Sequence, residues 1–423
     1  MNKKIDSNYD VLVIGAGPAG TISAAIIAKA GYKVAIVEKL KFPRFVIGES
    51  LLPRCMAALD EAGFLPAVTA KKFQQKTGAK FVRLKENQRE VFDINFSEAH
   101  TSGHTWTWQV PRAEFDQVLA LECEKQGIPV FFETEVVDIK IHSDESSTTT
   151  VLAQDGAKTE INAKFIVDGS GYGRVIPKLY NLERPSTLPA RQALFSHFTD
   201  SKRHERDDEP NRITIYIYNE NTWVWYIPFS NGTTSLGFVG YPDFFQNLKG
   251  TDEEKLRYLI ASHKELSEQF TGSEMKFSPM TLKSWSVTTD KFYGPGFVLT
   301  GNVTEFLDPV FSSGVTLASV SAQNAAHLVI KKLNGEVVNW EKDYMEECMK
   351  GVEVFRTFVT SWYNTDLHSI FFANQKNQTM KNQIASVLAG YVWDTTNPFV
   401  DQHGKYVKKL AQFLKYKEQQ TNI

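Results

Sequence analysis

The stretch Tyr9-Asp10-Val11-Leu12-Val13-Ile14-Gly15-Ala16-Gly17-Pro18-Ala19-Gly20 decides the fold. Its first six residues form an apolar, β-rich run, Pro18 to Ala30 has the small apolar residues of a helix packed on a sheet, and Lys33 to Val37 predicts a second strand. The three glycines permit a tight turn, bring backbone amides close to a pyrophosphate and let helix and strand pack closely. Glu38 ends the second strand, where this fingerprint has an acid for a ribose hydroxyl. The stretch predicts a Rossmann-like βαβ unit that binds a dinucleotide.

The glycines alone could mark an ordinary tight turn, and a nicotinamide protein would match the fingerprint as well as a flavoprotein. FAD therefore has to be argued from other segments. Phe165 to Gly171 and Gly296 to Asn302 each read as a buried strand that runs into a glycine turn. Both look like edges of a cofactor site, so the nucleotide-binding part is expected to be discontinuous.

The middle of the chain has the alternation of an antiparallel sheet. Ile213, Ile215 and Ile217 alternate with more polar residues, and residues 222–228 are followed by Asn231-Gly232, a type I′ hairpin signal. From about Trp340 the pattern is helical. The last helix has an apolar face of Val407, Leu410, Ala411 and Leu414 opposite several lysines. A docked terminal helix is favoured over contact with a membrane or a carrier protein.

The predicted fold class is therefore α/β: a Rossmann-like dinucleotide-binding domain, an antiparallel β-sheet substrate region and a C-terminal helical segment. The expected domains are residues 1–185 and 286–340 for the cofactor, 186–285 for the sheet and 341–423 for the helices.

Composition excludes several classes of protein. With 47 basic against 49 acidic residues, the chain has no global field to hold nucleic acid or an anionic membrane. The three cysteines include no C-x-x-C, so we expect no disulfide framework and a reducing, cytoplasmic location. No apolar run is long enough for a membrane span. His100 and His104 lack a third ligand nearby, so no metal site is predicted.

At this point the residues resemble a known family, the flavin-dependent halogenases within the p-hydroxybenzoate-hydroxylase-like flavoproteins, from about Tyr9 to about Ala326. The resemblance rests on the fingerprint with Glu38, Gly48-Glu49-Ser50, Phe73-Gln74-Gln75-Lys76-Thr77-Gly78, Trp223-Val224-Trp225-Tyr226-Ile227-Pro228, and Phe306-Leu307-Asp308-Pro309-Val310-Phe311-Ser312-Ser313-Gly314. The last two segments are the most specific.

The resemblance implies FAD as the cofactor. The residues that it implies for the FAD site are Gly15, Gly17, Gly20, Glu38, Ser50, Arg112, Asp168, Gly301, Asn302 and Pro309. On its own, Arg112 could equally belong to a surface ion pair. The family usually has aspartate at the position of Asn302. An amide oxygen still accepts a hydrogen bond from a ribityl hydroxyl but without charge assistance, so FAD binding is expected to survive in a weaker form.

The segment 306–314 precedes an alanine-rich helix, and free amides at a helix start can hold an anion. An ordinary capped helix start is the plainer interpretation. The resemblance implies that the amides of Ser313 and Gly314 bind a halide, chloride or bromide. Trp223 and Trp225 share one face of a strand and could be a pair of core aromatics. In the family, this motif forms a wall that keeps the organic substrate away from the flavin.

Lys76 is the predicted catalytic residue. Lys71, Lys72 and Lys80 lie nearby, and the residues alone would allow Lys76 to be one more solvated charge. The family pattern of phenylalanine, two spacers, lysine, spacer and glycine selects Lys76. Its ammonium could direct hypohalous acid by hydrogen bonding, or its neutral amine could form a haloamine.

The reaction implied is halogenation that depends on reduced FAD and oxygen, through a flavin C4a-hydroperoxide and hypohalous acid directed by Lys76. One dinucleotide fingerprint is apparent, so a separate flavin reductase is expected to supply reduced FAD. Phe311 stands where tryptophan halogenases have a glutamate, which favours a phenolic or pyrrole-like ring, free or tethered to a carrier protein, with Phe311 as part of the substrate wall. The alternatives are an FAD-dependent aromatic or isoprenoid monooxygenase on the same fold and a flavin-binding protein without turnover.

Overall fold

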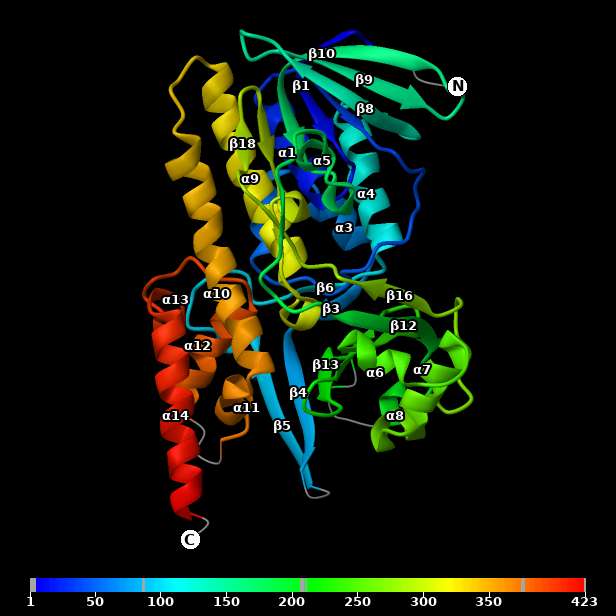
Figure 1. Cartoon of the computed structure of the whole chain (residues 1–423), viewed down its shortest axis with the longest axis vertical. Helices are drawn as coiled ribbons and strands as arrows, with labels where there is room; N and C mark the ends of the chain where they lie inside the picture. The colour runs from blue at the N-terminus through cyan, green and yellow to red at the C-terminus, as the bar shows by residue number, and fades with distance from the viewer. Residues whose placement is uncertain (1–4, 86–87, 206–208, 210, 374–376, 422–423) are drawn as a thin grey trace.

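The computed structural model describes residues 5–85, 88–205, 209, 211–373 and 377–421. The α/β architecture predicted from the sequence is confirmed. One end of the molecule holds a mixed sheet covered by helices, the other end holds a second sheet, and the C-terminal helices lie beside that second sheet (Figure 1).

The first sheet is the Rossmann-like one. Its strands in spatial order are β18 (Tyr293–Gly294), β19 (Phe297–Leu299), β10 (Lys158–Asp168), β1 (Asn8–Ile14), β2 (Val34–Val37) and β7 (Val130–Phe131), with β8 (Thr134–Ile141) and β9 (Ser147–Ala153) attached through β10. The strands from β19 to β7 run parallel, and the register pairs Ile14 with both Val37 and Asp168. The carboxyl ends of these strands therefore meet at one edge, where open α/β sheets bind ligands.

Three long helices cover this sheet: α1 (Pro18–Lys29), α4 (Arg112–Lys125) and α9 (Ser313–Leu333). Helix α1 is buried from Pro18 to Ile27 because it lies between the sheet and the other two helices. Its small residues permit close packing, and the Ser23 hydroxyl donates to the Ala322 carbonyl of α9 at 3.4 Å. Segments about 300 residues apart thus form one nucleotide-binding layer.

The second sheet is almost entirely antiparallel. Its order is β16 (Met280–Lys283), β12 (Gln192–Thr199), β15 (Thr233–Gly240), β14 (Trp223–Pro228), β13 (Thr214–Ile217), β4 (Gly78–Lys85) and β5 (Gln88–Asn95). The pairing of β13 with β4 is parallel. The domain division expected from the sequence leaves β4 and β5 in the cofactor domain, whereas the structure adds them to this sheet.

The predicted hairpin between β14 and β15 is present, but its turn differs from the predicted type I′. Gly232 has φ +80°, whereas Asn231 is not among the described residues with positive φ, and type I′ requires positive φ at both central positions. The Phe229 N–H donates to the Thr233 carbonyl, which leaves a three-residue loop that ends in a left-handed glycine. The Asn231 side chain accepts the Thr233 N–H and shapes this loop.

Short elements connect the two halves. β3 (Gln74–Lys76) pairs with β6 (Thr107–Gln109), and β11 (Glu183–Pro185), β17 (Val287–Thr289) and β20 (Glu305–Phe306) form a small third sheet. The shorter helices are α2 (Cys55–Glu61), α3 (Leu65–Ala70), α5 (Val175–Leu179), α6 (Pro242–Gln246), α7 (Asp252–Ala261) and α8 (Lys264–Phe270).

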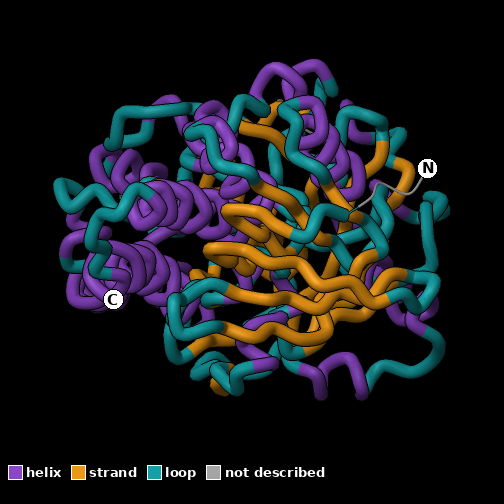
Figure 2. The backbone as a smooth tube through the Cα atoms, turned by 90° about the horizontal axis from the view of Figure 1, so that it is seen from above, coloured by secondary structure: helices purple, strands orange, loops and turns teal. Residues whose placement is uncertain are grey.

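The C-terminal region is helical, as predicted. It comprises α10 (Glu346–Tyr363), α11 (Asp366–Phe371), α12 (Gln378–Leu388), α13 (Pro398–Asp401) and α14 (His403–Thr421). These helices gather on one side of the molecule and the strands on the other (Figure 2). Val407 and Ala411 of α14 have no exposed surface, so the terminal helix is docked through its apolar face.

Within the described part of the chain, no helix is long and apolar enough to cross a membrane. The described histidines, cysteines and acids form no group of three or more that could hold a metal ion. Cys55, Cys123 and Cys348 are free and buried.

Candidate active site

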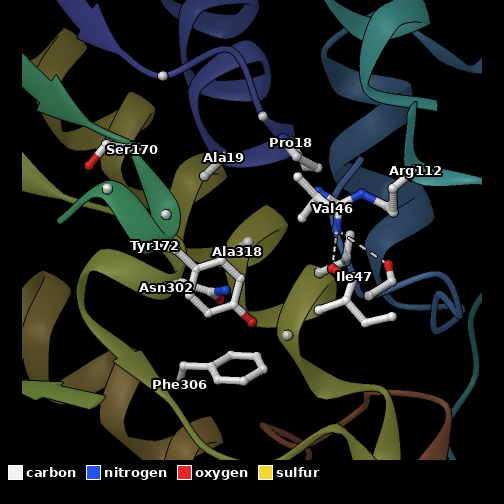
Figure 3. A pocket seen from close by; sticks show the side chains of 18 of the residues that line it. Pro18, Ala19, Val46, Ile47, Arg112, Ser170, Tyr172, Asn302, Phe306 and Ala318 are labelled. Atoms are coloured by element: carbon white, nitrogen blue, oxygen red, sulfur yellow. Dashed lines mark hydrogen bonds between the residues drawn. The ribbon is translucent and has the colours of Figure 1, made fainter. Parts of the chain in front are cut away.

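A cavity of about 640 Å³ lies at the carboxyl edge of the first sheet and extends to the second sheet. Its lining comes from the fingerprint turn, the end of β2, the loop 44–50, the turn after β10, the start of α9 and the strands β13 and β14. Figure 3 shows part of this lining, with Arg112 on one side of the cavity and Tyr172, Asn302 and Phe306 on the other. The Tyr172 and Phe306 rings pack edge to face at 5.7 Å between centroids.

The fingerprint turn has the geometry that a pyrophosphate requires. Gly15 has φ +94°, and a Cβ there would come within 3.0 Å of Gly169 and Ser170 in the turn after β10. A Cβ at Gly20 would collide with the Gly15 carbonyl, so this glycine sets the close approach of α1 to β1. Helix α1 begins after Gly17 without a side-chain cap, which leaves its first amides available for phosphate oxygens.

Glu38 lies at the end of β2 as predicted. Its carboxylate accepts the Ala16 N–H at 2.9 Å and the Leu40 N–H at 2.9 Å. These two bonds fix the carboxylate against the fingerprint turn and leave further lone pairs for ribose hydroxyls. The turn, the uncapped helix and this acid together fit the adenosine and pyrophosphate parts of FAD.

Arg112 is buried and does not form a surface ion pair. Its guanidinium makes two hydrogen bonds to Asp116, at 2.8 and 2.9 Å, and donates to the carbonyls of Ile47 and Gly48 at 3.2 and 3.3 Å (Figure 3). The arginine therefore holds the loop that lines one side of the cavity.

The predicted cofactor residues fall into two groups. Those that line the cavity are Gly15, Gly17, Glu38, Ser50, Arg112, Asn302 and Pro309. Gly20, Asp168 and Gly301 lie behind the lining. Asp168 is fully buried and accepts the N–H groups of Ser170 and Ile176 at 2.9 and 2.8 Å, so it shapes the turn after β10.

The start of α9 faces the same cavity through Gly314. Ser312 adopts a left-handed conformation with φ +57°, and α9 begins at Ser313 without a side-chain cap. Its first amides are therefore available to an anion. Ser313 itself is buried and its side chain does not line the cavity.

Lys76 is buried, unlike the exposed Lys71 and Lys72. Its ammonium donates to the Ser50 hydroxyl and to the Leu51 carbonyl, both at 2.8 Å. Burial lowers the pKa of Lys76 to about 7. Since Ser50 lines the cavity, Lys76 is separated from the cavity by one side chain, and near neutral pH it can either donate as an ammonium or act as an amine.

Trp223 and Trp225 of β14 line the cavity, with ring centroids 6.2 Å apart. The Trp223 indole N–H donates to the Tyr363 hydroxyl at 3.0 Å, and that hydroxyl donates to the Asp308 carboxylate at 3.0 Å. Burial raises the pKa of Asp308 to about 6. Tyr363 belongs to α10, in the region for which the sequence offered no motif.

Phe311 lies in an aromatic core and not on the cavity. Its ring packs against Phe81, Phe358 and Trp362 at centroid distances of 6.1, 5.9 and 5.9 Å. Its assignment to a substrate wall therefore stays a prediction.

Glu49 is a buried acid at the cavity whose own role is not predicted from the sequence. Its carboxylate contacts the His197 Nε2 of β12 at 2.8 Å. The motif Gly48-Glu49-Ser50 marked the position, but its partner could not be found because His197 is 148 residues away.

Comparison with known proteins identifies the cofactor and the family. The family model described as FAD binding domain matches residues 8–352. The 1H-pyrrole-2-carbonyl-[peptidyl-carrier protein] chlorinase of Pseudomonas fluorescens is 29% identical over 409 residues, covering 92% of this chain and 90% of the relative.

Two solved structures extend the comparison. A flavoprotein/dehydrogenase of Cytophaga hutchinsonii is 52% identical, with a TM-score of 0.94 and coverage of 97% of this chain and 100% of the other. The flavin-dependent halogenase CmlS is 26% identical, with a TM-score of 0.75 and coverage of 89% and 68%. The chain is an oxidoreductase that belongs to the FAD binding domain family, and the proteins that it is similar to include flavin-dependent halogenases.

Proposed function

We propose that this protein halogenates an electron-rich aromatic ring, phenolic or pyrrole-like, with hypohalous acid that Lys76 directs. The observation that carries the proposal is the place of Lys76, which is buried and bonded to Ser50 at the cavity edge. A buried amine with a pKa near 7 suits both hydrogen bonding to hypohalous acid and formation of a haloamine.

Bound FAD in its reduced form, with oxygen and a halide, supplies the electrophilic halogen. The uncapped start of α9 would hold the halide through the amides of Ser313 and Gly314. The indoles of Trp223 and Trp225 would exclude the organic ring from the cavity, so that only a small oxidant passes to Lys76. A ring with its own hydroxyl or ring nitrogen shares the developing positive charge and depends less on a nearby carboxylate, which fits an apolar Phe311.

The named relatives are compatible with a free substrate and with one attached to a carrier protein. Two of them are named for pyrrole rings on a peptidyl-carrier protein, so a carrier-bound ring and a free one both remain candidates. The name flavoprotein/dehydrogenase, given to the structure of 52% identity, favours a second candidate, an FAD oxidoreductase that does not use halide. The buried Lys76 and the paired indoles favour the halogenase.

Mass spectrometry of products decides between these candidates. The protein would be supplied with FAD, a flavin reductase, NADH and either chloride or bromide, together with a panel of phenols and pyrroles. We expect product that carries the supplied halogen and that disappears when halide is omitted. A hydroxylated product that forms equally without halide would overturn the proposal.

Lys76→Ala tests the role of the lysine. Removal of a positioned catalytic group typically costs ~10²-fold or more in rate, so we expect halogenation to be lost. FAD affinity and release of hydrogen peroxide should persist because Ser50, and not Lys76, lines the cavity. Lys71→Ala, at an exposed position, is the matched control. Full halogenation by Lys76→Ala would refute the assignment.

A further inference from the structure

The guanidinium of Arg54 is partly buried and has no partner among the residues that the structure describes. Arg54 precedes α2, and within the described part of the chain its guanidinium makes no hydrogen bond, while its Nη1 is buried. Four other buried arginines each pair with a carboxylate: Arg112 with Asp116, Arg174 with Glu183, Arg203 with Asp200 and Arg212 with Asp93. Arg191, which has no such acid, is instead stacked between the rings of Tyr241 and Tyr363, each at 3.7 Å.

A partly buried guanidinium without a counter-charge lowers the stability of the folded protein. Burial lowers the pKa of Arg54, and the groups that oppose this effect are Tyr391 and Cys55, neither of them a carboxylate. Burying a charge without a counter-charge or hydrogen bonds is unfavourable, so an anion that enters and pairs with the group is bound strongly. The missing partner therefore points to a ligand that brings its own negative charge.

Arg54 and Lys76 share a neighbour, Cys55, and neither of the two cations lines the cavity. The Lys76 ammonium bonds to Leu51, three residues before Arg54, and the charges of Lys76 and Arg54 both act on the Cys55 thiol. Ser50 lines the cavity, whereas Arg54 and Cys55 do not. Ser50 thus lies between the cavity and Lys76, and Cys55 is near both Lys76 and Arg54.

The surroundings of Arg54 come from segments remote in sequence. The backbone N–H of Arg54 donates to the Ala389 carbonyl at 3.0 Å. The hydroxyl of Tyr391, two residues further along the chain from Ala389, donates to the His104 carbonyl at 2.8 Å. The start of α2, the chain near His104 and the loop after α12 thus meet around Arg54.

We propose that Arg54 binds a carboxylate carried by the aromatic substrate and so places the ring at Lys76. The assignment rests on the proposed function, in which the ring receives the halogen at Lys76. A guanidinium presents two parallel N–H donors that match the two oxygens of a carboxylate, which fixes orientation as well as adding affinity. The substrate class is then a hydroxylated or pyrrole-type aromatic acid.

Equilibrium binding to the FAD-loaded protein tests this inference without turnover. The probes are 3,5-dihydroxybenzoate and its methyl ester, and pyrrole-2-carboxylate and its methyl ester, each titrated by calorimetry. Because charge-assisted hydrogen bonds contribute about 1.5 to 3 kcal/mol, we expect at least one acid to bind about 10- to 100-fold more tightly than its ester. Arg54→Gln should abolish this preference, and Arg54→Lys should keep part of it.

The control is Arg257→Gln, which removes the same charge from an exposed position on α7 and should leave the preference intact. Binding of every acid no more tightly than its ester, including no binding at all, overturns the inference, as does an unchanged preference in Arg54→Gln. The carboxylate preference without any halogenated product would leave Arg54 assigned and overturn the halogenase. Halogenated product without the carboxylate preference would support the proposed halogenase and overturn the assignment of Arg54.

Discussion

At the scale of single residues, the charge on Lys76 couples function to stability. The side chain is buried, and its hydrogen-bond partners, the Ser50 hydroxyl and the Leu51 carbonyl, are neutral. A lysine kept for packing alone would be replaced at little cost by an apolar side chain of similar length. The buried amine of Lys76 therefore lowers the stability of the fold, and its position beside Ser50 points to a functional role.

The first prediction is that Lys76→Met changes the pH dependence of stability. In the unfolded chain the pKa is near 10.5, and in the folded protein it is about 7. Between these values the unfolded state binds a proton that the folded state does not, so the free energy of unfolding of the wild type rises with pH by about 1.4 kcal/mol per unit. Below pH 7 both states are protonated and the full cost of the buried charge remains.

Lys76→Met lacks this contribution. Its stability relative to the wild type should therefore be greatest below pH 7 and should decline from pH 7 to 10.5. Denaturant unfolding between pH 6 and 9.5 measures the difference. Lys71→Met, at an exposed position, should show no such trend. A difference between Lys76→Met and wild type that stays constant over this range would contradict the depressed pKa.

At the scale of elements, α10 is joined to the cavity wall by the chain from Trp223 through Tyr363 to Asp308. This chain connects β14, α10 and the segment before α9, which lie far apart in sequence. The Tyr363 hydroxyl satisfies two buried groups at once, because it accepts from the Trp223 N–H and donates to the Asp308 carboxylate. The orientation of the indole therefore depends on the C-terminal helices.

The second prediction is that Tyr363→Phe loosens the indole wall. The substitution leaves the Trp223 N–H and one oxygen of the buried Asp308 without partners, which costs about 1 to 3 kcal/mol for each such group. We expect a lower free energy of unfolding and an altered near-ultraviolet circular dichroism spectrum. Tyr406→Phe in α14 serves as control. Unchanged stability and spectrum in Tyr363→Phe would show that the chain does not hold the indole.

The third prediction concerns the packing of α1 on β1. Gly20→Ala places a Cβ against the Gly15 carbonyl, so helix and turn must separate, and we expect loss of FAD affinity together with lower stability. Gly404→Ala in α14 meets no atom within 4 Å and should stabilise the protein by about 1 kcal/mol. Fluorescence titration with FAD and thermal unfolding compare the two. FAD binding by Gly20→Ala equal to that of the wild type would contradict the predicted collision.

The same elements show what could be predicted from the sequence. The βαβ unit, the β14–β15 hairpin and the start of α9 were recognised because their signals lie within a few residues: glycine spacing, alternation and a turn before an alanine-rich helix. The pairing of β13 with β4 joins Thr214 to Lys80, and no local pattern records such a contact. The partners Tyr363 and His197, and the isolation of Arg54, likewise depend on tertiary contacts.

At the scale of the whole molecule, the cofactor cavity lies between two sheets, and each supplies a different surface. The first sheet and the starts of α1 and α9 supply backbone amides. The second sheet supplies Ile215 of β13, Ile213 just before that strand, and Trp223, Trp225 and Ile227 of β14. The phosphate end of FAD is thus expected at the first sheet. The ring end would then face an apolar wall, which would exclude water from the place where the halogen oxidant forms in the proposed reaction.

This arrangement has a consequence for the source of electrons. A nicotinamide that reduced the flavin on this protein would need its own dinucleotide site and an approach to the ring. The sequence has one convincing glycine fingerprint, and its turn lines the cavity assigned to FAD. We therefore expect a separate flavin reductase to deliver reduced FAD.

The fourth prediction is that NADPH alone does not reduce FAD bound to this protein at a rate that supports turnover. Under anaerobic conditions the absorbance of oxidised flavin should persist after addition of NADPH or NADH, and it should fall when a flavin reductase is added. Dithionite provides the control that the bound flavin can be reduced. Rapid bleaching by NADPH without a reductase would mean that a nicotinamide reaches the ring past the wall of β13 and β14, and it would favour the monooxygenase over the halogenase.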